Sequence, residues 1–353
     1  MKARHWIGIL VSAVCLWWAL RGTDWGEVGR TLARADPWLL LGAAAGTLVV
    51  SVGLRGLRWR LFLPSGAAAP GRELVTATGI GLMANNVLPV RIGEFVRPWV
   101  LGRRTGVPVT TAFGSLLVER LFDACVLFGV LLAAALVLEL PVWMTRGAWI
   151  AAALFAAVLA GSTAFLFAPR PFFRVVHAVG RRVLPERWEH ELEGALDRFH
   201  AGFVLLRDPR RAAVALAATA LLWAANGALY WMGLAALGAG GVGFGGAMFV
   251  QSVAAVGVSL PSSPGFVGTF QASVKAALGI LAVPEDVAVS YAIAFHVAQY
   301  LPVTLAGFVL LARADVGLRE IGRSEEQVEA GLEQVGEVVE SVVAEGDPAG
   351  GHS

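Results

Sequence analysis

Six long apolar runs dominate the chain. A helix that crosses the hydrocarbon core of a bilayer needs about 20 predominantly apolar residues. Runs of this kind cover residues 6–20, 38–54, 109–138, 148–167, 212–237 and 287–312. This pattern predicts an all-α polytopic membrane protein with six full spans. The first two runs are short, which helix tilt or local thinning of the bilayer can accommodate.

Two further apolar regions, residues 74–90 and 244–281, are interrupted by proline, glycine, serine or asparagine. The first leads into NNVLPVRIGEFVRP, which begins at Asn85, and the second contains LPSSPG, which begins at Leu260. Proline breaks a helix because it lacks a backbone donor. In lipid the freed backbone groups must face protein or water. We therefore expect two re-entrant helical hairpins that line a polar cavity.

Basic residues predict the orientation. Arg55, Arg58, Arg60 and Arg72 follow the second run, nine arginines lie in residues 169–211, and Arg313 follows the last run. The connections at 21–37 and 139–147 have few bases or balance them with acids. The positive-inside rule then places both termini in the cytoplasm, so that one hairpin opens inward and the other outward.

Both interruptions share the pattern L-P-x-x-x-G, at residues 88–93 and 260–265, with an offset of 261 − 89 = 172 residues. A short pattern recurs easily by chance. Its position at each break nevertheless predicts inverted repeats, an architecture of transporters in which the substrate site lies at the broken helices.

Two segments lie outside the apolar runs. Residues 169–211 have apolar positions at helical spacing, which predicts either amphipathic helices on the inner leaflet or a solvated linker. Residues 313–353 are acidic and are expected to form a largely disordered cytoplasmic tail. The chain is thus expected to comprise a transmembrane domain, residues 1–312, and this tail.

The composition narrows the class of protein. Hydrophobic residues make up 57% of the 353 residues and charged residues 15%, with a mean hydropathy of +0.67 and a net charge of +2. A soluble domain carries about a quarter charged residues. The arginines form no basic stripe with stacking aromatics, so we expect no nucleic acid partner. Two cysteines and no ligand spacing predict no disulfide framework, metal site or cofactor.

Charged residues cluster at the first break. Glu94 and Arg97 are spaced i, i+3 and could pair, which would leave Arg91 for a phosphate. Alternatively, these residues simply mark the cytoplasmic edge of the hairpin. Asn85 and Asn86 precede the break.

A second charged cluster, Glu119, Arg120 and Asp123, interrupts the run at 109–138. Charges inside the membrane are costly and usually face a bundle interior or a water-filled path. Glu119 and Asp123 share a helix face, and Arg120 can reach Asp123 at i, i+3. The cluster is either part of a substrate path or an ion-pair network that holds helices together.

Polar residues also mark the second half of the chain. His296 and Gln299 interrupt the last run, and the histidine is either a packing residue or a proton carrier. Asn226 and Gln251 are expected to make interhelical hydrogen bonds. The chain contains no phosphate loop, zinc-protease motif, nucleophile elbow or dinucleotide fingerprint.

The two stretches NNVLPVRIGEFVRPWVLGRRTGVP and SLLVERLFDACVL resemble the flippase-like family named for the transmembrane region of lysylphosphatidylglycerol synthase. Its members show a proline, then R-x-G-E, an arginine, and later E-R-x-x-D. The matching residues here are Pro89, Arg91, Gly93, Glu94, Arg97, Glu119, Arg120 and Asp123. The resemblance covers about residues 5–312 and includes the segment LPSSPGFVGTFQ.

Two positions depart from the family pattern. Gln271 stands where members usually have a glutamate, and His296 where the last span often has an arginine. These departures put the substrate or the coupling in question. The aminoacyl-transferring domain of the fused members is soluble and separate, and the residues after Arg313 are too few for such a domain. The resemblance therefore implies movement of a lipid headgroup between leaflets without lipid aminoacylation.

We thus expect a transporter of the inner membrane that flips a phospholipid or lipid-linked headgroup. One alternative is a membrane enzyme with Glu94 or Asp123 as general base. Another is a non-transporting partner that docks through residues 169–211 and the tail. Self-association stays open. The expected substrate-binding residues are Asn85, Asn86, Pro89, Arg91, Gly93, Glu94, Arg97, Glu119, Arg120, Asp123, Pro261, Pro264, Gly265, Gly268, Gln271 and His296.

Overall fold

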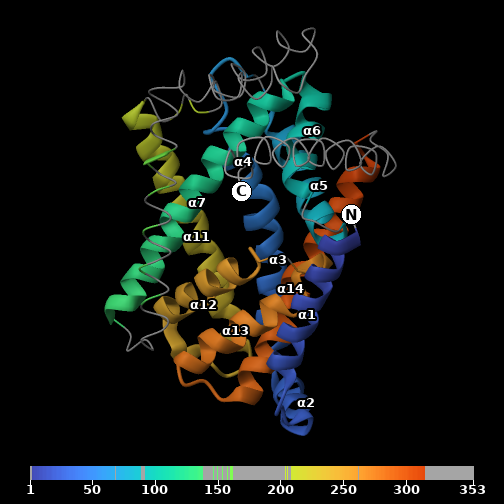
Figure 1. The fold of residues 1–353 in the computed structure, drawn as a ribbon, viewed down its shortest axis with the longest axis vertical. Coiled ribbons are helices and arrows are strands. Elements are labelled where there is room, and N and C mark those ends of the chain that lie inside the picture. The colour runs from blue at the N-terminus through green and yellow to red at the C-terminus, as the bar shows by residue number, and fades with distance from the viewer. Residues whose placement is uncertain are drawn as a thin grey trace, which may run out of the picture.

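The computed structural model of the protein is a bundle of helices, most of which run along one long axis (Figure 1). It describes residues 2–67, 69–88, 92–137, 208–260 and 262–314, together with single positions between 146 and 205. Most of the expected span at 148–167 lies outside the described residues, as do most of the connection at 169–211 and nearly all of the tail. Every regular element in the described residues is a helix.

The helices differ in length from 3 to 29 residues. In chain order they are α1 (Lys2–Leu20), α2 (Trp25–Arg34), α3 (Pro37–Thr47), η1 (Leu48–Leu54), α4 (Arg55–Trp59), α5 (Gly71–Val87), α6 (Gly93–Thr105), α7 (Val109–Val137), α11 (Pro209–Ala236), η5 (Gly240–Val242), α12 (Gly243–Gly257), η6 (Pro264–Phe266), α13 (Thr269–Ile280) and α14 (Glu285–Ala312).

Five described helical stretches are long and apolar enough to cross a membrane, namely Pro37–Trp59, Val109–Val137, Pro209–Ala236, Gly240–Gly257 and Glu285–Ala312. Four of them match expected spans. The fifth, Gly240–Gly257, was expected to be one arm of a hairpin, while the apolar part of α1 is only Gly8–Leu20. The chain is therefore an all-helical, multi-pass membrane protein.

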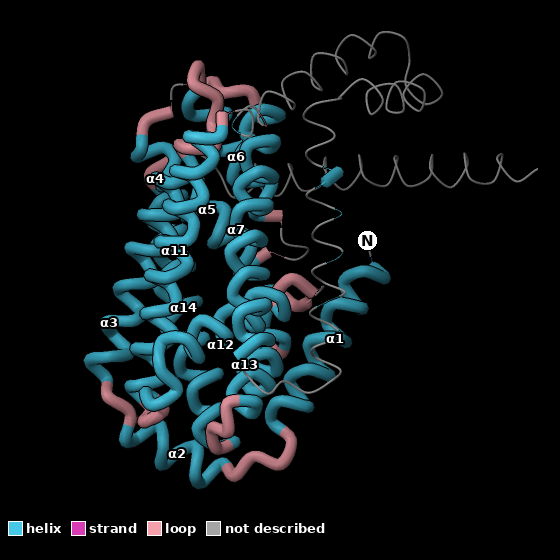
Figure 2. The backbone as a smooth tube through the Cα atoms, turned by 90° about the vertical axis from the view of Figure 1, so that its left-hand side faces the viewer, coloured by secondary structure: helices cyan, strands magenta, loops and turns pink. Residues whose placement is uncertain are grey.

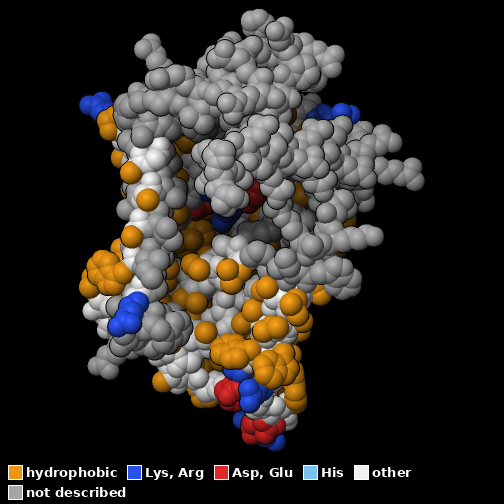
Figure 3. Space-filling view, viewed as in Figure 1, with side chains coloured by type: hydrophobic (Ala, Val, Ile, Leu, Met, Phe, Trp, Pro, Cys, Tyr) orange, Lys and Arg blue, Asp and Glu red, His pale blue; other side chains and the backbone are white. Residues whose placement is uncertain are grey.

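The outer surface agrees with this class. Trp38, Leu136 and Leu221 are 79%, 83% and 72% exposed, which in a soluble protein would be an unusual concentration of bare apolar side chains. Figure 3 shows hydrophobic side chains across the described part of one face, with acidic and basic side chains gathered at its lower tip. Lipid is the solvent that such a surface requires.

Aspartates begin three of the helices. Asp24, Asp36 and Asp208 each accept hydrogen bonds from the backbone N–H groups two and three residues later. This satisfies donors that have no partner within the helix. Pro37 and Pro209 follow two of these caps, at the first helical position, where the missing N–H costs nothing.

The first interrupted region forms a close pair of helices, α5 and α6. A Cβ added to Gly93 would lie 2.0 Å from the carbonyl oxygen of Gly81, so the two backbones touch because both positions are glycine. Asn85 Oδ1 accepts a hydrogen bond of 2.8 Å from Gly93 N–H and ties the end of α5 to the start of α6. Pro89 and Arg91, in the connection, lie outside the described residues.

The second interrupted region forms a second pair, α12 and α13. The connection turns at Gly265 (φ 72°) and Gly268 (φ 94°), both in the left-handed region that favours glycine. A Cβ on Gly268 would lie 2.1 Å from the carbonyl oxygen of Ser12, so α1 packs directly onto this turn. Pro264 begins η6, and Pro261 lies outside the described residues.

The two pairs lie toward opposite ends of the bundle, with α14 in contact with both (Figures 1 and 2). Each pair has its own apolar core. One core surrounds Trp59, Leu74 and Val100, and the other surrounds Phe249, Phe270 and Phe295. The polar side chains described next lie between these two cores.

Candidate functional site

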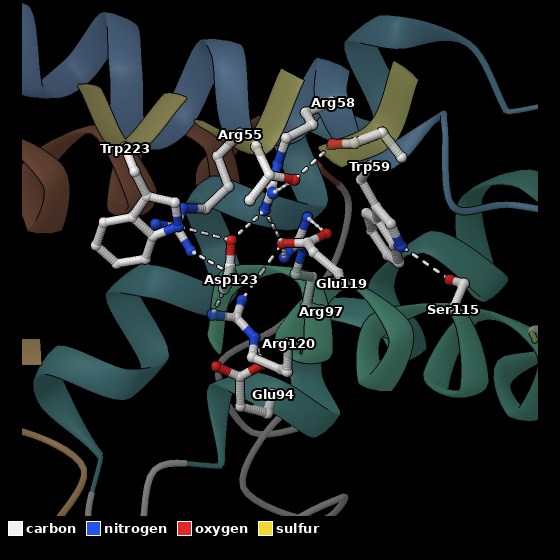
Figure 4. A network of polar contacts seen from close by, with 12 residues as sticks. Arg55, Arg58, Trp59, Glu94, Arg97, Ser115, Glu119, Arg120, Asp123 and Trp223 are labelled. Atoms are coloured by element: carbon white, nitrogen blue, oxygen red, sulfur yellow. Dashed lines mark hydrogen bonds and ion pairs between the residues drawn. The ribbon is translucent and has the colours of Figure 1, made fainter. Parts of the chain in front are cut away.

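The centre of the charged cluster is a buried ion pair between α6 and α7. Arg97 donates two hydrogen bonds, of 3.0 and 3.1 Å, to the two carboxylate oxygens of Glu119. Glu119 is fully buried and Arg97 is 4% exposed. The guanidinium also lies over the Trp59 ring, 4.2 Å from its centroid, and Trp59 donates to Ser115 (Figure 4). The expected local pairing of Arg97 with Glu94 is wrong, because the packing of α6 on α7 brings Arg97 to the buried carboxylate of Glu119.

A second arginine, Arg58 of α4, completes the buried part of the cluster. Its Nη2 lies 2.9 Å from Asp123 Oδ1 and 3.1 Å from Glu119 Oε1, and its Nη1 donates to Thr219 at 2.6 Å. From the sequence, Arg58 was expected in a cytoplasmic loop. The membrane-length helix instead continues through it to Trp59.

Glu94 and Arg120 form the exposed edge of the cluster. Arg120 Nε lies 3.5 Å from Glu94 Oε2, and Arg120 Nη1 donates to Asp123 Oδ2 at 3.2 Å. The side chains of Arg120 and Glu94 are 37% and 33% exposed, whereas Glu119 and Asp123 are almost completely covered. The i, i+3 contact from Arg120 to Asp123 is confirmed.

Arg55 connects the cluster to a cavity. Its N–H bonds the carbonyl of Val50, five residues earlier, at the end of the π-helix η1, a geometry that often marks functional segments. Arg55 Nη1 lies 3.6 Å from Asp123 Oδ2, which already accepts from Arg120. The other oxygen, Asp123 Oδ1, accepts from Trp223 Nε1 and lies 2.9 Å from Arg58 Nη2. Arg55 is thus the least firmly paired of these arginines.

The cluster carries a net positive charge. Four arginines (55, 58, 97 and 120) and three carboxylates (94, 119 and 123) give 4 − 3 = +1 over the described members. Since Asp123 is satisfied by its other donors, the surplus charge lies at Arg55. An anion is therefore the ligand that this arrangement favours.

The cavity itself lies between the two helix pairs and has a volume of about 240 Å³. Its walls come mainly from α3, η1, α4, α5, α11, α12, η6, α13 and α14 and combine polar groups with aromatic rings. The polar and charged lining residues include Thr47, Ser51, Arg55, Asn86, Trp223, Asn226, Gln251, His296, Gln299 and Tyr300. Trp223 and Arg55 line the cavity and also contact Asp123, so the cavity and the charged cluster are one continuous site.

Gln271 and His296 form a hydrogen-bonded pair beside the second break. Gln271 Nε2 lies 2.8 Å from His296 Nδ1, and His296 Nε2 lies 2.9 Å from the carbonyl oxygen of Gly265. A carbonyl only accepts, so Nε2 carries the proton and Nδ1 accepts from the amide. Gln271 Oε1 in turn accepts from Gly268 N–H at 2.7 Å. These two residues therefore hold the glycine turn with neutral hydrogen bonds.

Tyr300 of α14 links the two breaks. Its hydroxyl donates to the carbonyl oxygen of Asn86 at 3.1 Å, while its ring lies where a Cβ on Gly265 would be. Asn86 Nδ2 also donates to Thr304 of α14 at 2.8 Å. The end of α5 and the turn before α13 are thus joined through one side chain.

We expect Tyr300→Phe to lower the free energy of unfolding by about 0.5–1.5 kcal/mol, the usual contribution of one hydrogen bond. Tyr300→Leu should cost more, because it also removes the ring that packs on Gly265 and His296. Thermal melting of the purified protein in detergent measures both. Identical melting of wild type and both variants would contradict the link.

Seven of the sixteen expected site residues come together around the cavity or the cluster. Asn86 and His296 line the cavity, and Glu94, Arg97, Glu119, Arg120 and Asp123 form the cluster. Asn85, Gly93, Pro264, Gly265, Gly268 and Gln271 shape the breaks without lining the cavity. Four residues of the site were not predicted from the sequence, namely Arg55, Arg58, Trp223 and Tyr300. For the two arginines the signal was available, since LRGLRW continues the helical spacing of the apolar run.

The described residues include no group of three or more His, Cys, Asp or Glu side chains that could hold a metal ion. The carboxylates of the cluster face arginines instead. The chemistry of the cluster is therefore that of ion pairing and hydrogen bonding.

A helical membrane bundle with a charged, hollow interior is the class that this fold and site define. Residues 5–307 match the family described as the lysylphosphatidylglycerol synthase TM region. The chain belongs to that family, as its motifs predict.

Two curated relatives are similar over part of the chain. One is the glycosyltransferase AglD of Haloferax volcanii, 37% identical over 123 residues, which are 35% of this chain and 20% of the relative. The other is the UPF0104 membrane protein of Methanothermobacter thermautotrophicus, 28% identical over 171 residues, 48% of this chain and 50% of the relative. The chain thus spans about a fifth of the length of the first relative and half of the length of the second.

Proposed function

We propose that the protein translocates a phospholipid or lipid-linked headgroup across the cytoplasmic membrane. The observation that carries the proposal is the continuous site formed by the cavity and the charged cluster inside a bundle with a lipid-facing surface. Charged groups in a membrane protein are retained at high cost and mark substrate paths. The headgroup would move through the cavity while the acyl chains remain in the bilayer.

The proposed topology has both termini in the cytoplasm. Arg72 lies at the start of α5, Arg104 at the end of α6, Arg210 at the start of α11 and Arg313 at the end of α14, and these helix ends gather at one end of the bundle (Figure 1). The positive-inside rule favours that end as the cytoplasmic one. In this arrangement α5–α6 and α12–α13 are re-entrant hairpins of opposite orientation, related as inverted repeats.

The proposed entrance is the edge of the cluster at Glu94 and Arg120. Figure 3 shows acidic and basic side chains near the middle of the molecule, apart from those at its lower tip. A phosphate that approached Arg120 would compete with three carboxylates for its guanidinium. Transfer to Arg55, which has one long ion pair, would then release the phosphate into the cavity.

The test is transport by purified protein in vesicles that contain acyl-labelled phosphatidylglycerol. Dithionite, which bleaches label in the outer leaflet only, should bleach the inner-leaflet half in vesicles with wild type and spare it in protein-free vesicles. Arg55→Gln should slow this phase about tenfold, the effect of losing about 1.4 kcal/mol. The matched control Arg30→Gln, on exposed α2, should behave as wild type. Equal bleaching with and without protein would overturn the proposal.

A second candidate function is a membrane enzyme that acts on a lipid-linked substrate. The partial similarity to a protein named a glycosyltransferase and the exposure of Glu94 favour it. Asp123 is a poor general base, since Arg58, Arg120 and Trp223 occupy its oxygens. A chemically altered lipid that appears with wild type and disappears with Glu94→Gln would support this alternative.

A further inference from the structure

Three buried polar atoms on side chains that line the cavity have no partner in the described part of the chain. Arg55 Nε, Gln251 Oε1 and Asn226 Oδ1 have no hydrogen-bond partner. The side chains that carry them come from three different helices and line the same cavity. An unsatisfied buried polar atom costs about 1–3 kcal/mol, so these atoms indicate what a ligand would supply.

The orientation of the Gln251 amide is fixed. Its Nε2 donates to the carbonyl oxygen of Trp223 at 3.1 Å, and a carbonyl oxygen cannot donate in return. Gln251 is 1% exposed. Its Oε1 is therefore a buried acceptor without a donor, on a side chain that lines the cavity. Asn226, one turn after Trp223 on α11, contributes a second free acceptor.

Three donors on the cavity wall, by contrast, are engaged within the protein. Thr47 donates to the Ala43 carbonyl at 2.9 Å, Tyr300 donates to the Asn86 carbonyl at 3.1 Å, and Asn86 donates to Thr304 at 2.8 Å. Among the buried polar side-chain atoms of the lining residues, those without a partner in the described part of the chain are one guanidinium nitrogen and two amide oxygens.

We propose that the translocated headgroup is an anionic phosphate that bears uncharged hydroxyl groups, such as a glycerol, inositol or sugar phosphate on a lipid anchor. The phosphate binds Arg55, and the hydroxyls donate to Gln251 and Asn226. This inference rests on the proposed function, because it names the substrate class of the same site.

A cationic headgroup fits this cavity poorly. Its described lining residues include no aspartate or glutamate, and their one ionised group is Arg55. An ammonium would lose its water without gaining a carboxylate, which is unfavourable in a buried site. Asp123, the carboxylate adjacent to Arg55, is already paired with Arg58 and Arg120.

The experiment is a competition for binding to the purified full chain in detergent, with phosphatidylglycerol, phosphatidylinositol, phosphatidic acid, phosphatidylethanolamine and lysylphosphatidylglycerol as probes. Phosphatidylglycerol and phosphatidylinositol should bind at least about tenfold more tightly than phosphatidylethanolamine and lysylphosphatidylglycerol, a difference of about 1.4 kcal/mol. Phosphatidic acid, which has the phosphate without the hydroxyls, should fall between the two groups. Equal or tighter binding of either ammonium lipid would overturn the inference.

Substitutions test the assigned contacts. Gln251→Glu keeps the shape and places a negative charge beside the phosphate, so phosphatidylglycerol should bind about tenfold more weakly and phosphatidylethanolamine more tightly. Asn226→Ala, at a less buried position, should reduce the preference for phosphatidylglycerol over phosphatidic acid and keeps the test open if Gln251→Glu does not fold. An unchanged order of affinities in a folded Asn226→Ala protein would contradict the assignment.

The vesicle assay separates this inference from the proposed function. Selective binding of hydroxylated lipids by a wild type that moves no lipid would refute translocation and leave the headgroup assignment standing. Transport of phosphatidylethanolamine as fast as phosphatidylglycerol would refute the headgroup assignment and leave translocation standing.

Discussion

Replacing Glu119 with glutamine should destabilise the protein by about 3–5 kcal/mol, because it leaves the buried charges of Arg97 and Arg58 without their shared carboxylate. Glu119 is fully buried, so neither water nor lipid headgroups can compensate. The apparent Tm in detergent should fall by roughly 5–10 °C.

The control for this substitution is Glu27→Gln on α2, where the exposed carboxylate pairs with Arg30. That variant should melt as wild type does. A second test is the double variant Glu119→Gln with Arg97→Gln, which should recover part of the loss since the uncompensated charge is removed as well. If Glu119→Gln melts like its control, the cluster is not the buried ion-pair network described here.

Replacing Gly93 with alanine should be the second most damaging single change. The added Cβ would lie 2.0 Å from the Gly81 carbonyl oxygen and 2.5 Å from Asn85 Oδ1. The α5–α6 pair would have to separate, and the hydrogen bond from Gly93 to Asn85 would be lost. Overpacking alone typically costs about 1–3 kcal/mol, and loss of the hydrogen bond adds to it. We expect low yield of folded protein and transport near the protein-free rate.

Gly129→Ala provides the matched control. Gly129 lies within α7, and a Cβ there would meet nothing within 4 Å. Alanine is favoured over glycine in a helix by roughly 0.5–1 kcal/mol, so this variant should be as stable as wild type or slightly more so. The two glycine-to-alanine changes should therefore have opposite signs. Equal effects would show that the close approach of α5 and α6 is not required.

The sequence could predict which side chains are buried but not which of them pair. Glu119 and Asp123 stand out since charges in an apolar run must face an interior. The partner of Arg97 could not be deduced, because helical spacing reports neighbours on one helix whereas α7 approaches α6 only in the folded bundle. Gln271 and His296 were each recognised as polar residues in apolar surroundings. Their mutual hydrogen bond likewise depends on tertiary packing.

Arg55 and Arg58 were misplaced for a different physical reason. Arginines after an apolar run usually mark the cytoplasmic end of a span, and this rule assigned both to a loop. In the structure the helix continues through a π-helical segment, η1, and carries both side chains into the bundle. Tyr300 was missed since a tyrosine in an apolar run carries no charge and gives no signal of its own.

The central claim is that a wet chamber lies between the two broken helix pairs inside the bilayer. Cysteine labelling tests it most directly, in a background with Cys15 and Cys125 replaced by alanine. Ser51 lines the cavity, whereas Val49, two residues earlier on η1, is 60% exposed on the apolar outer surface. In membranes, a charged, water-soluble thiol reagent should modify Ser51→Cys at least about tenfold faster than Val49→Cys. The reagent reaches only thiols that are in contact with water, and a thiol must ionise to the reactive thiolate, which lipid prevents. Equal rates, or faster labelling of Val49→Cys, would show that no such chamber exists.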